Sequence, residues 1–245
     1  MTTVRRLIDR VHPEIFEQFP GYCWGKVICW DLDNRRGVEE ATLLLREVEA
    51  RVRQDDSLGD VVSHPKIAAW RQAFSQFGAR PSKFQASVEA LVRRARRGDA
   101  LPPINALVAL YNAVSLRFLV PIGGDDLDLV SGGLHLRLAQ GDEPYVPLGA
   151  EAEEPPEAGE VIYADDAKVL CRRWSWRGGE KTKISTATTN AVLNVHGLAP
   201  ASLDEVTRAT ETLATLVRQV CGGASTWYVQ DQARPMVVTE VPVRT

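Results

Sequence analysis

Apolar residues recur at a helical interval in the middle of the chain and change to strand-like alternation afterwards. In residues 103–118, one face of a helix is predicted from the spacing of Leu107, Leu110, Tyr111, Val114 and Phe118. Pro121 and the Gly-Gly-Asp-Asp turn at residues 123–126 then break this helix. Past the turn, a half-buried strand is predicted because leucines alternate with polar residues from Leu134 to Leu138.

The polar residues of the central helix also share one side. At about 100° per residue, Asn105, Asn112 and Ser115 lie within roughly a quarter of a turn of one another. Arg117 is the only formal charge in the predicted helix, so we expect the helix to be buried nearly all round. Two interpretations are open. Either Asn105 caps the helix and Asn112 binds a neighbouring loop, or these neutral groups form the floor of a pocket.

The N-terminal part of the chain mixes helical and strand patterns. A short helix, interrupted at Pro13, is expected in residues 2–19 from the spacing of Val4, Leu7, Ile8 and Val11. Residues 22–31, YCWGKVICWD, are rich in aromatic and β-branched side chains and predict a strand. Residues 38–53 follow a helical period. We expect this strand and helix to add to the sheet of a main domain.

Two further helices precede the central one. The first follows His64-Pro65, and the second is expected to start at Ser82 and to end at Gly98. Its last turns carry a cluster of four arginines, Arg93, Arg94, Arg96 and Arg97. These arginines complement the C-terminal end of the helix dipole and face water, or they bind the phosphates of a nucleic-acid backbone.

The C-terminal half predicts the larger share of the strands. Residues 149–160 are acidic and proline-rich and predict an exposed loop. Strands are expected at residues 161–163, 169–176, 181–185 and 190–195, with residues 177–180 turning one hairpin. A capping box at residues 202–205 starts a long amphipathic helix that ends at Gly222, and STWYVQ and MVVTEVPV predict two last strands.

Composition narrows the class of protein. The 245 residues are 44% hydrophobic and 25% charged, which fits a soluble protein with one large domain or two small ones. A net charge of -3 argues against a protein that holds nucleic acid by bulk charge, so any RNA contact must come from local patches. We expect no membrane span and a cytoplasmic location, because no apolar run is long enough and the N-terminus is charged.

Motifs of common cofactor and metal enzymes are missing from the sequence. There is no GxGxxG, P-loop, HExxH or GxSxG pattern, and the four cysteines show no CxxC spacing, so we expect buried thiols, no cofactor and no metal. Asp125, Asp126 and Asp128 are better explained by turn and helix-cap chemistry than by a cation site. No serine or cysteine lies in a context that would activate it as a nucleophile.

Two separated runs resemble a known family. PINALVALYNAVSLRFLVPIGGDDLDLVSGG resembles the pattern PINNxVDxTNYxxxxxGQPxHAFDLDxxxGG of the B3/B4 domain, the tRNA-editing module of the bacterial phenylalanyl-tRNA synthetase beta subunit, without a gap from Pro103 to Asp128. VIYADD and TTNAVLNVHGLAP resemble its VIAD and TTDxLLExAxFxP segments. The chain is more similar still to freestanding B3/4 proteins, which keep GxxPSKxxxSxEAL, LYNxxSL, PIGGxDLD and CRRWxWR. The resemblance covers about residues 77–222.

The resemblance implies the fold. It predicts an α+β protein with a B3/B4-like domain in which a mixed or antiparallel sheet packs against helices. We expect a strand-helix extension at residues 1–77 that packs on the main domain, the B3/B4-like domain at residues 78–230, and a C-terminal strand or tail at residues 231–245.

The resemblance also implies where a site would lie. The family's histidine falls on Gly123, and the glutamate that recognises the tyrosine hydroxyl falls on Asn194, so both side chains differ here. The family's small AGxMGG residues fall near Arg173, Trp174 and Ser175; Trp174 and Trp176 either pack in the core or line the site. The candidate residues are catalytic Asn112, Ser115, Thr188 and Asn194, substrate-binding Gly123, Gly124, Trp174 and Thr189, and tRNA-binding Arg93, Arg94, Arg96, Arg97, Arg172 and Arg173.

By this resemblance the first hypothesis is a freestanding trans-editing factor, not a complete synthetase. It would bind aminoacyl-tRNA and hydrolyse the ester of a mischarged amino acid with a positioned water and no strong base. The second hypothesis is a non-catalytic B3/B4 module that keeps affinity for tRNA or for a small ligand such as an amino acid but has lost editing. A third is a pocket for a free amino acid or metabolite.

Overall fold

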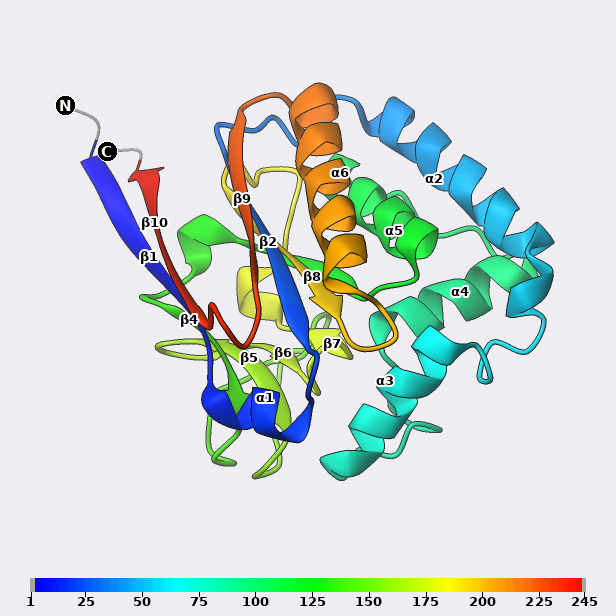
Figure 1. Cartoon of the computed structure of the whole chain (residues 1–245). Helices are drawn as coiled ribbons and strands as arrows, with labels where there is room; N and C mark the ends of the chain where they lie inside the picture. Colours follow the sequence, from blue (N-terminus) through cyan, green and yellow to red (C-terminus); the bar gives the residue numbers. More distant parts are fainter. Residues whose placement is uncertain (1–2, 244–245) are drawn as a thin grey trace.

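The two ends of the chain pair with each other. In the computed structural model, which describes residues 3–243, β1 (Thr3–Val11) runs antiparallel to β10 (Met236–Val243), as Figure 1 shows. These strands begin a six-stranded sheet of order β10-β1-β4-β5-β6-β7, in which β1 and β4 are parallel and the other pairs are antiparallel. A second sheet of four antiparallel strands has the order β3-β8-β2-β9.

The remaining elements have the following bounds. The helices are α1 (Pro13–Gln18), α2 (Val38–Gln54), α3 (Pro65–Gln76), α4 (Ser87–Arg97), α5 (Ala106–Phe118) and α6 (Leu203–Cys221), with short 3-10 turns η1 (Asp56–Leu58), η2 (Leu127–Leu129) and η3 (Glu180–Thr182). The strands are β2 (Cys23–Trp30), β3 (Ile122–Asp126), β4 (Leu134–Leu138), β5 (Val161–Asp165), β6 (Val169–Arg172), β7 (Arg177–Gly178), β8 (Ala191–Gly197) and β9 (Ala224–Gln230). This confirms the predicted α+β class.

Helices cover one side of the four-stranded sheet. α6 lies across β2, β8 and β9, and α5 lies between α2 and α6 (Figure 1). α6 starts at the predicted capping box, where the Ser202 side chain accepts from the Glu205 amide and the Glu205 side chain accepts from the Ser202 amide. α5 is buried along most of its length, as its lack of charge predicts. Asn105 caps it by accepting from the Val108 amide, which confirms the capping part of the first interpretation of its polar residues.

β5 separates two hydrophobic clusters. Val161 and Tyr163 face the main core, whereas Ile162 and Ala164 face a smaller cluster with Tyr145 on the other side of the sheet. Residues 149–160 form no helix or strand, which confirms the predicted loop.

The predicted N-terminal helix is wrong before Pro13, because residues 3–11 form β1, whereas residues 13–18 do form a helix, α1. Leu7, Asp9 and Val11 are fully buried while Val4 and Ile8 are exposed, which is the period of two of a strand. Apolar residues at 4, 7, 8 and 11 fit a helix as well as a strand, and the pairing with β10 decides between them.

Three details of the second half also differ from the predictions. The Gly-Gly-Asp-Asp segment is not a turn but β3, paired with β8. Residues 181–185 are not a strand, since they begin in η3. The hairpin turn lies at residues 173–176, between β6 and β7, and not at residues 177–180. Arg173 and Trp174 in this turn have φ of 46° and 63°, in the left-handed region that side chains disfavour.

The N-terminal segment is more than an extension. β2 is an inner strand between β8 and β9, and β1 is an inner strand between β10 and β4. Residues before the predicted main domain therefore contribute to both sheets, and residues after it contribute β10 to the six-stranded sheet.

Candidate functional site

A cavity of about 660 Å³ lies beside the four-stranded sheet. Its wall combines β3, β8, β5, the 174–179 segment, residues 183–186 and the facing sides of α4 and α5. Ile104 and Leu148 on this wall are exposed, whereas Asp125, Tyr163, Asn194 and His196 are each less than 10% exposed. We call the first two residues the mouth and the other four the closed end.

One row of residues crosses the four-stranded sheet at the closed end. Gly123 of β3 pairs with Asn194 of β8, Asn194 pairs with Lys26 of β2, and Lys26 pairs with Tyr228 of β9. Residues paired across neighbouring strands project to the same face, so this row points to one side of the sheet. A Cβ at Gly123 would meet nothing within 4 Å, so this position leaves open space in the wall.

Lys26 is a buried cation directly behind the cavity wall. Its Nζ donates to Asn194 Oδ1 at 2.6 Å and to the Tyr163 hydroxyl at 3.1 Å, and lies 3.4 Å from Asp9 Oδ2. It also lies 3.5 Å from the centroid of the Trp24 ring. Burial lowers the pKa of Lys26 to about 8, and the negative charge of Asp9 opposes that shift.

Asp9 completes this network from β1. Its Oδ2 accepts from the Tyr228 hydroxyl at 2.9 Å, and burial raises the pKa of the Asp9 carboxyl. Our sequence analysis missed both Asp9 and Lys26. The signal for Lys26 was present, because it is the one charged residue in the otherwise apolar strand CWGKVICW.

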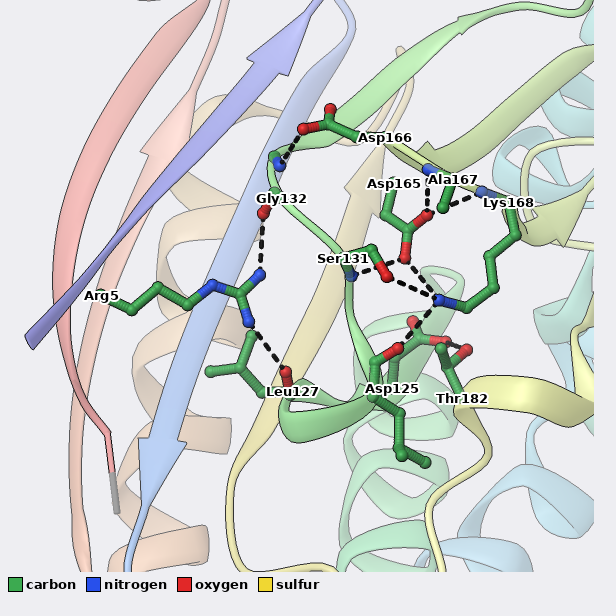
Figure 2. Close-up of polar contacts among 12 residues, drawn as sticks. Arg5, Asp125, Leu127, Ser131, Gly132, Asp165, Asp166, Ala167, Lys168 and Thr182 are labelled. Carbon is green, nitrogen blue, oxygen red and sulfur yellow. Dashed lines mark hydrogen bonds and ion pairs between the residues drawn. The ribbon is translucent and has the colours of Figure 1, made fainter. Parts of the chain in front are cut away.

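Asp125 is a carboxyl in the cavity wall. Its Oδ1 accepts from Thr182 Oγ1 at 2.7 Å, and burial raises its pKa to about 7 (Figure 2). We had assigned Asp125 to turn chemistry, but β3 places it on the same side of the strand as Gly123. The cap assignment holds for Asp126, which accepts from the Asp128 amide.

A set of polar contacts fixes the segment that follows Asp125. Figure 2 shows Arg5 donating to the carbonyls of Leu127 and Gly132, and Asp165 accepting from the Ser131 amide and from Lys168. These contacts tie residues 127–132 to β1 and β5, and so hold β3 at the cavity.

His196 is another titratable group that sequence reasoning did not place. Its Nδ1 lies 2.8 Å from the Tyr22 hydroxyl, and its ring stacks on Trp24. Burial lowers the pKa of His196 to about 3, so the imidazole is neutral at neutral pH. It therefore offers the closed end a hydrogen-bonding group without charge.

The structure brings several predicted residues together at this cavity. They are Asn112, Gly123, Gly124, Trp174 and Asn194. Asn112 is half-buried on α5, and its side-chain amide makes no hydrogen bond within residues 3–243. It therefore does not bind a neighbouring loop, as the interpretation with Asn105 as the helix cap expected. Trp174 is fully buried and contacts the rings of Phe19, Tyr22 and Trp70 edge-on, so it serves both the core and the wall.

Other predicted residues lie outside the cavity wall. The Ser115 hydroxyl donates to the carbonyl of Val120, which ends α5, and the Thr188 hydroxyl donates to Asp126. Thr189 accepts from the Leu32 amide through its carbonyl. The hydroxyls of Ser115 and Thr188 thus stabilise local structure. We do not assign the two threonines or Ser115 a role at the cavity.

Arg172 and Arg173 are buried, contrary to their predicted contact with tRNA. Both pair with Glu160, and Arg172 also pairs with Glu154 and Arg173 with Glu157. Their side chains are 2% and 5% exposed, so their guanidinium groups hold the 150–160 loop against β6 and do not face solvent.

The α4 arginines are more accessible. Arg94 is exposed, and its side chain makes no hydrogen bond or ion pair within the described residues. Arg97 pairs with Asp99 at the surface, Arg93 pairs with Glu89, and Arg96 donates to the carbonyls of Arg53 and Asp55. Arg94 and Arg97 are the members of the cluster best placed to meet a ligand.

Two further classes of site are not seen in the described structure. Among residues 3–243, no group of three or more His, Cys, Asp or Glu side chains is placed to hold a metal ion. No helix in that range is both long and apolar enough to cross a membrane.

Comparison with known proteins gives consistent results. Residues 69–222 match the family described as the B3/4 domain. The phenylalanine–tRNA ligase beta subunit of Fusobacterium nucleatum subsp. nucleatum is 29% identical over 126 residues, which cover 51% of this chain and 15% of that protein. The same subunit from Neisseria meningitidis serogroup B is 29% identical over 168 residues, covering 58% of this chain and 21% of that protein.

A solved structure also resembles the chain. It is an N-terminal fragment of the phenylalanyl-tRNA synthetase beta subunit from Pyrococcus horikoshii, with 15% identity and a TM-score of 0.47, covering 100% of this chain and 57% of that one. The chain thus spans a minor part of the two ligase subunits it matches.

Proposed function

This chain belongs to the B3/4 domain family, and from that premise we propose that it acts in trans as an aminoacyl-tRNA deacylase that removes a mischarged amino acid. The observation that carries the proposal is the convergence of Asn112, Gly123 and Asn194 on one cavity. These residues come from separate elements, α5, β3 and β8, and the fold brings all three to one wall.

The shape of the cavity suggests how the substrate enters. A tRNA end is too large to be enclosed in about 660 Å³, so the ribose ester stays near the mouth and the aminoacyl side chain points to the closed end. Trp174 and the glycines of β3 flank that path. The side chain of the amino acid therefore meets Asn194, and the ester lies closer to the mouth.

The reaction needs a positioned water and little else. Water attacks the ester carbonyl carbon, the bond to the ribose oxygen breaks, and that oxygen takes a proton, which releases a free amino acid and tRNA. We assign Asn112 to holding this water or the ester carbonyl, because its amide is half-buried at the wall and makes no other bond within the described residues. Holding the reactants in position supplies much of the rate for such a step.

α4 connects the cavity to the arginine cluster. Ser87, its first residue, lines the cavity, and the exposed Arg94 and Arg97 lie in its last turns. The 11 residues of α4 span about 16 Å at the usual rise per residue. We propose that these arginines contact phosphates of the acceptor end while the charged terminus enters the mouth.

A panel of labelled aminoacyl-tRNAs tests the activity. We expect hydrolysis well above the buffer rate for at least one amino acid, and a loss of tenfold or more in Asn112→Ala, Asn194→Ala and Trp174→Ala. Lys66→Met is a matched control, since Lys66 pairs with Glu205 away from the cavity wall. Hydrolysis at the buffer rate for every member of the panel would remove the proposal.

The residue at position 123 favours a second candidate function, a binding module without catalysis. The family pattern has a histidine where this chain has Gly123, and Gly123 leaves open space where that side chain would lie. Under this alternative, charged tRNA binds and its ester survives. A gel-shift titration run beside the deacylation panel separates the two functions.

A further inference from the structure

The contact between Lys26 and Asn194 determines which way the Asn194 amide faces. A lysine ammonium has three donors and no acceptor, so the amide atom 2.6 Å from its Nζ must be the oxygen. The opposite orientation would set two donor groups against each other. Lys26 therefore removes the usual ambiguity of an asparagine side chain.

Lys26 itself is not available to a ligand. It is 0% exposed, and its three donor directions are taken by Asn194, Tyr163 and Asp9. Its Nζ also lies over the Trp24 ring. The lysine thus acts on the cavity only through the groups that it binds.

The Asn194 amino group is the part that remains for a ligand. Asn194 lines the cavity, and of the two N–H groups on its Nδ2 the Tyr163 hydroxyl accepts from one, which leaves the other for a ligand. With the oxygen turned back toward Lys26, the closed end presents an N–H donor. Ligand binding removes water from this donor. A ligand with a matching acceptor therefore binds more tightly than a ligand that has no acceptor there.

We propose that Lys26 is a positioning residue for Asn194, and that the cavity selects aminoacyl side chains ending in a neutral acceptor oxygen over hydrocarbon side chains of the same shape. The inference deepens the proposed function and rests on it, since the proposed deacylase activity places the aminoacyl side chain at the closed end. The chemical class is a hydroxyl, a carboxamide or a similar uncharged oxygen.

Asp125 explains why the oxygen should be neutral. Its carboxyl lines the same cavity, on the same side of β3 as Gly123. Near and above neutral pH this carboxyl is substantially ionised, because its pKa is about 7. A ligand carboxylate would be repelled there, whereas a hydroxyl or carboxamide can accept from Asn194 and donate to Asp125.

Matched pairs of ligands test this selection. The probes are 3′-(aminoacylamino)-3′-deoxyadenosines, in which an amide replaces the labile ester, carrying threonine or valine, asparagine or leucine, and methionine sulfoxide or methionine. Calorimetry should show the oxygen-bearing member binding at least tenfold tighter in one or more pairs. Binding within threefold in all pairs, tighter binding of the hydrocarbon members, or no binding of any probe would overturn the inference.

Two variants test the role of Lys26. Asn194→Asp keeps an oxygen for Lys26 but turns a second oxygen toward the ligand, so the preference for methionine sulfoxide, which only accepts, should fall to threefold or less. The double variant Asp9→Asn/Lys26→Met removes both buried charges at once, so neither charge is left buried without its partner and the protein should still fold. It should lower the oxygen preference while leaving the affinity of the hydrocarbon members unchanged, and Lys66→Met should keep both.

The outcomes separate this inference from the proposed function. If the double variant weakens both members of each pair equally, Lys26 is only structural and the inference fails. If charged tRNA is hydrolysed without any preference for oxygen-bearing side chains, the proposed deacylase activity stands and the inference fails. If the oxygen-bearing amide probes bind more tightly but no ester is hydrolysed, the proposed deacylase activity is wrong and the proposed selection stands.

Discussion

Gly123 and Gly124 are neighbours in β3 but face different surroundings. A Cβ at Gly123 meets nothing within 4 Å, whereas a Cβ at Gly124 would lie 2.5 Å from Leu193 Cδ2 and 3.1 Å from the Val192 carbonyl oxygen. One glycine therefore leaves space at the cavity, and the other permits close packing of β3 against β8.

This difference predicts opposite effects of one substitution. Gly123→Ala should leave the free energy of unfolding unchanged or raise it by up to about 1 kcal/mol, because alanine restricts the unfolded chain without a clash. Gly124→Ala should lower it by about 1 to 3 kcal/mol through overpacking. Urea unfolding of both variants measures this, and equal destabilisation would show that the open space at Gly123 is not real.

Asp125 gives a prediction for pH. Its pKa is raised by burial from 3.8 to about 7, so between these values the folded state binds more protons than the unfolded state, and stability falls as pH rises. Asp125→Asn keeps an oxygen for Thr182 and removes this penalty. At pH 8 the free energy of unfolding of the variant should exceed that of the natural chain by a few kcal/mol. The difference should shrink toward zero near pH 4, and a constant difference across this range would contradict the shift.

Sequence reasoning found some of these residues and missed others for a physical reason. Asn112 and Asn194 could be picked out because they interrupt apolar runs and fall in motifs of a known pattern. Lys26 and Asp9 belong to strands whose partners are far away in sequence, and their meaning depends on a contact between two sheets. Ser115 has the right chemistry in the right helix, but the end of α5 uses its hydroxyl.

At the scale of elements, α6 sets the position of β2 and hence of Lys26. Gly25, next to Lys26 on β2, faces Thr210 of α6 so closely that a Cβ would lie 1.9 Å from Thr210 Oγ1. Glycine is therefore required here for the close approach of helix and sheet.

The contact between Gly25 and Thr210 can be measured by a double-mutant cycle. Gly25→Ala should destabilise the protein by about 2 kcal/mol, because Thr210 is buried and its hydroxyl is bonded to the Val206 carbonyl. Thr210→Ala in the same chain should recover part of this loss, since it removes the two atoms other than Cβ that crowd the site. Additive effects of the two substitutions would mean that helix and sheet do not meet as described.

Helices with strong local signals were the elements best predicted from sequence. The capping box predicted the start of α6, and the helical spacing of apolar residues in an almost uncharged segment predicted α5. β1 was mistaken for a helix and β3 for a turn, because each is a strand only by virtue of a distant partner, β10 in one case and β8 in the other. Local propensity does not contain that information.

At the scale of the whole molecule, the family match and the folding unit have different boundaries. The match covers residues 69–222, but that range lacks β1, β2, β9 and β10. Without β2 and β9, the four-stranded sheet keeps only β3 and β8, and Asn194 loses its contact with Lys26. We therefore expect a fragment of residues 69–222 to show no cooperative thermal unfolding.

A circular permutant provides the control for this fragment. Thr3 pairs with Val243, so residue 245 can be joined directly to residue 1, and new ends can be opened between Glu151 and Ala152, which are exposed in a loop. This chain keeps every strand and should unfold cooperatively, with a midpoint within about 10 °C of the natural chain. If the fragment also unfolds cooperatively, then the two sheets do not depend on β1, β2, β9 and β10, and the architecture described is wrong. A permutant that does not fold would contradict the placement of the two chain ends beside each other.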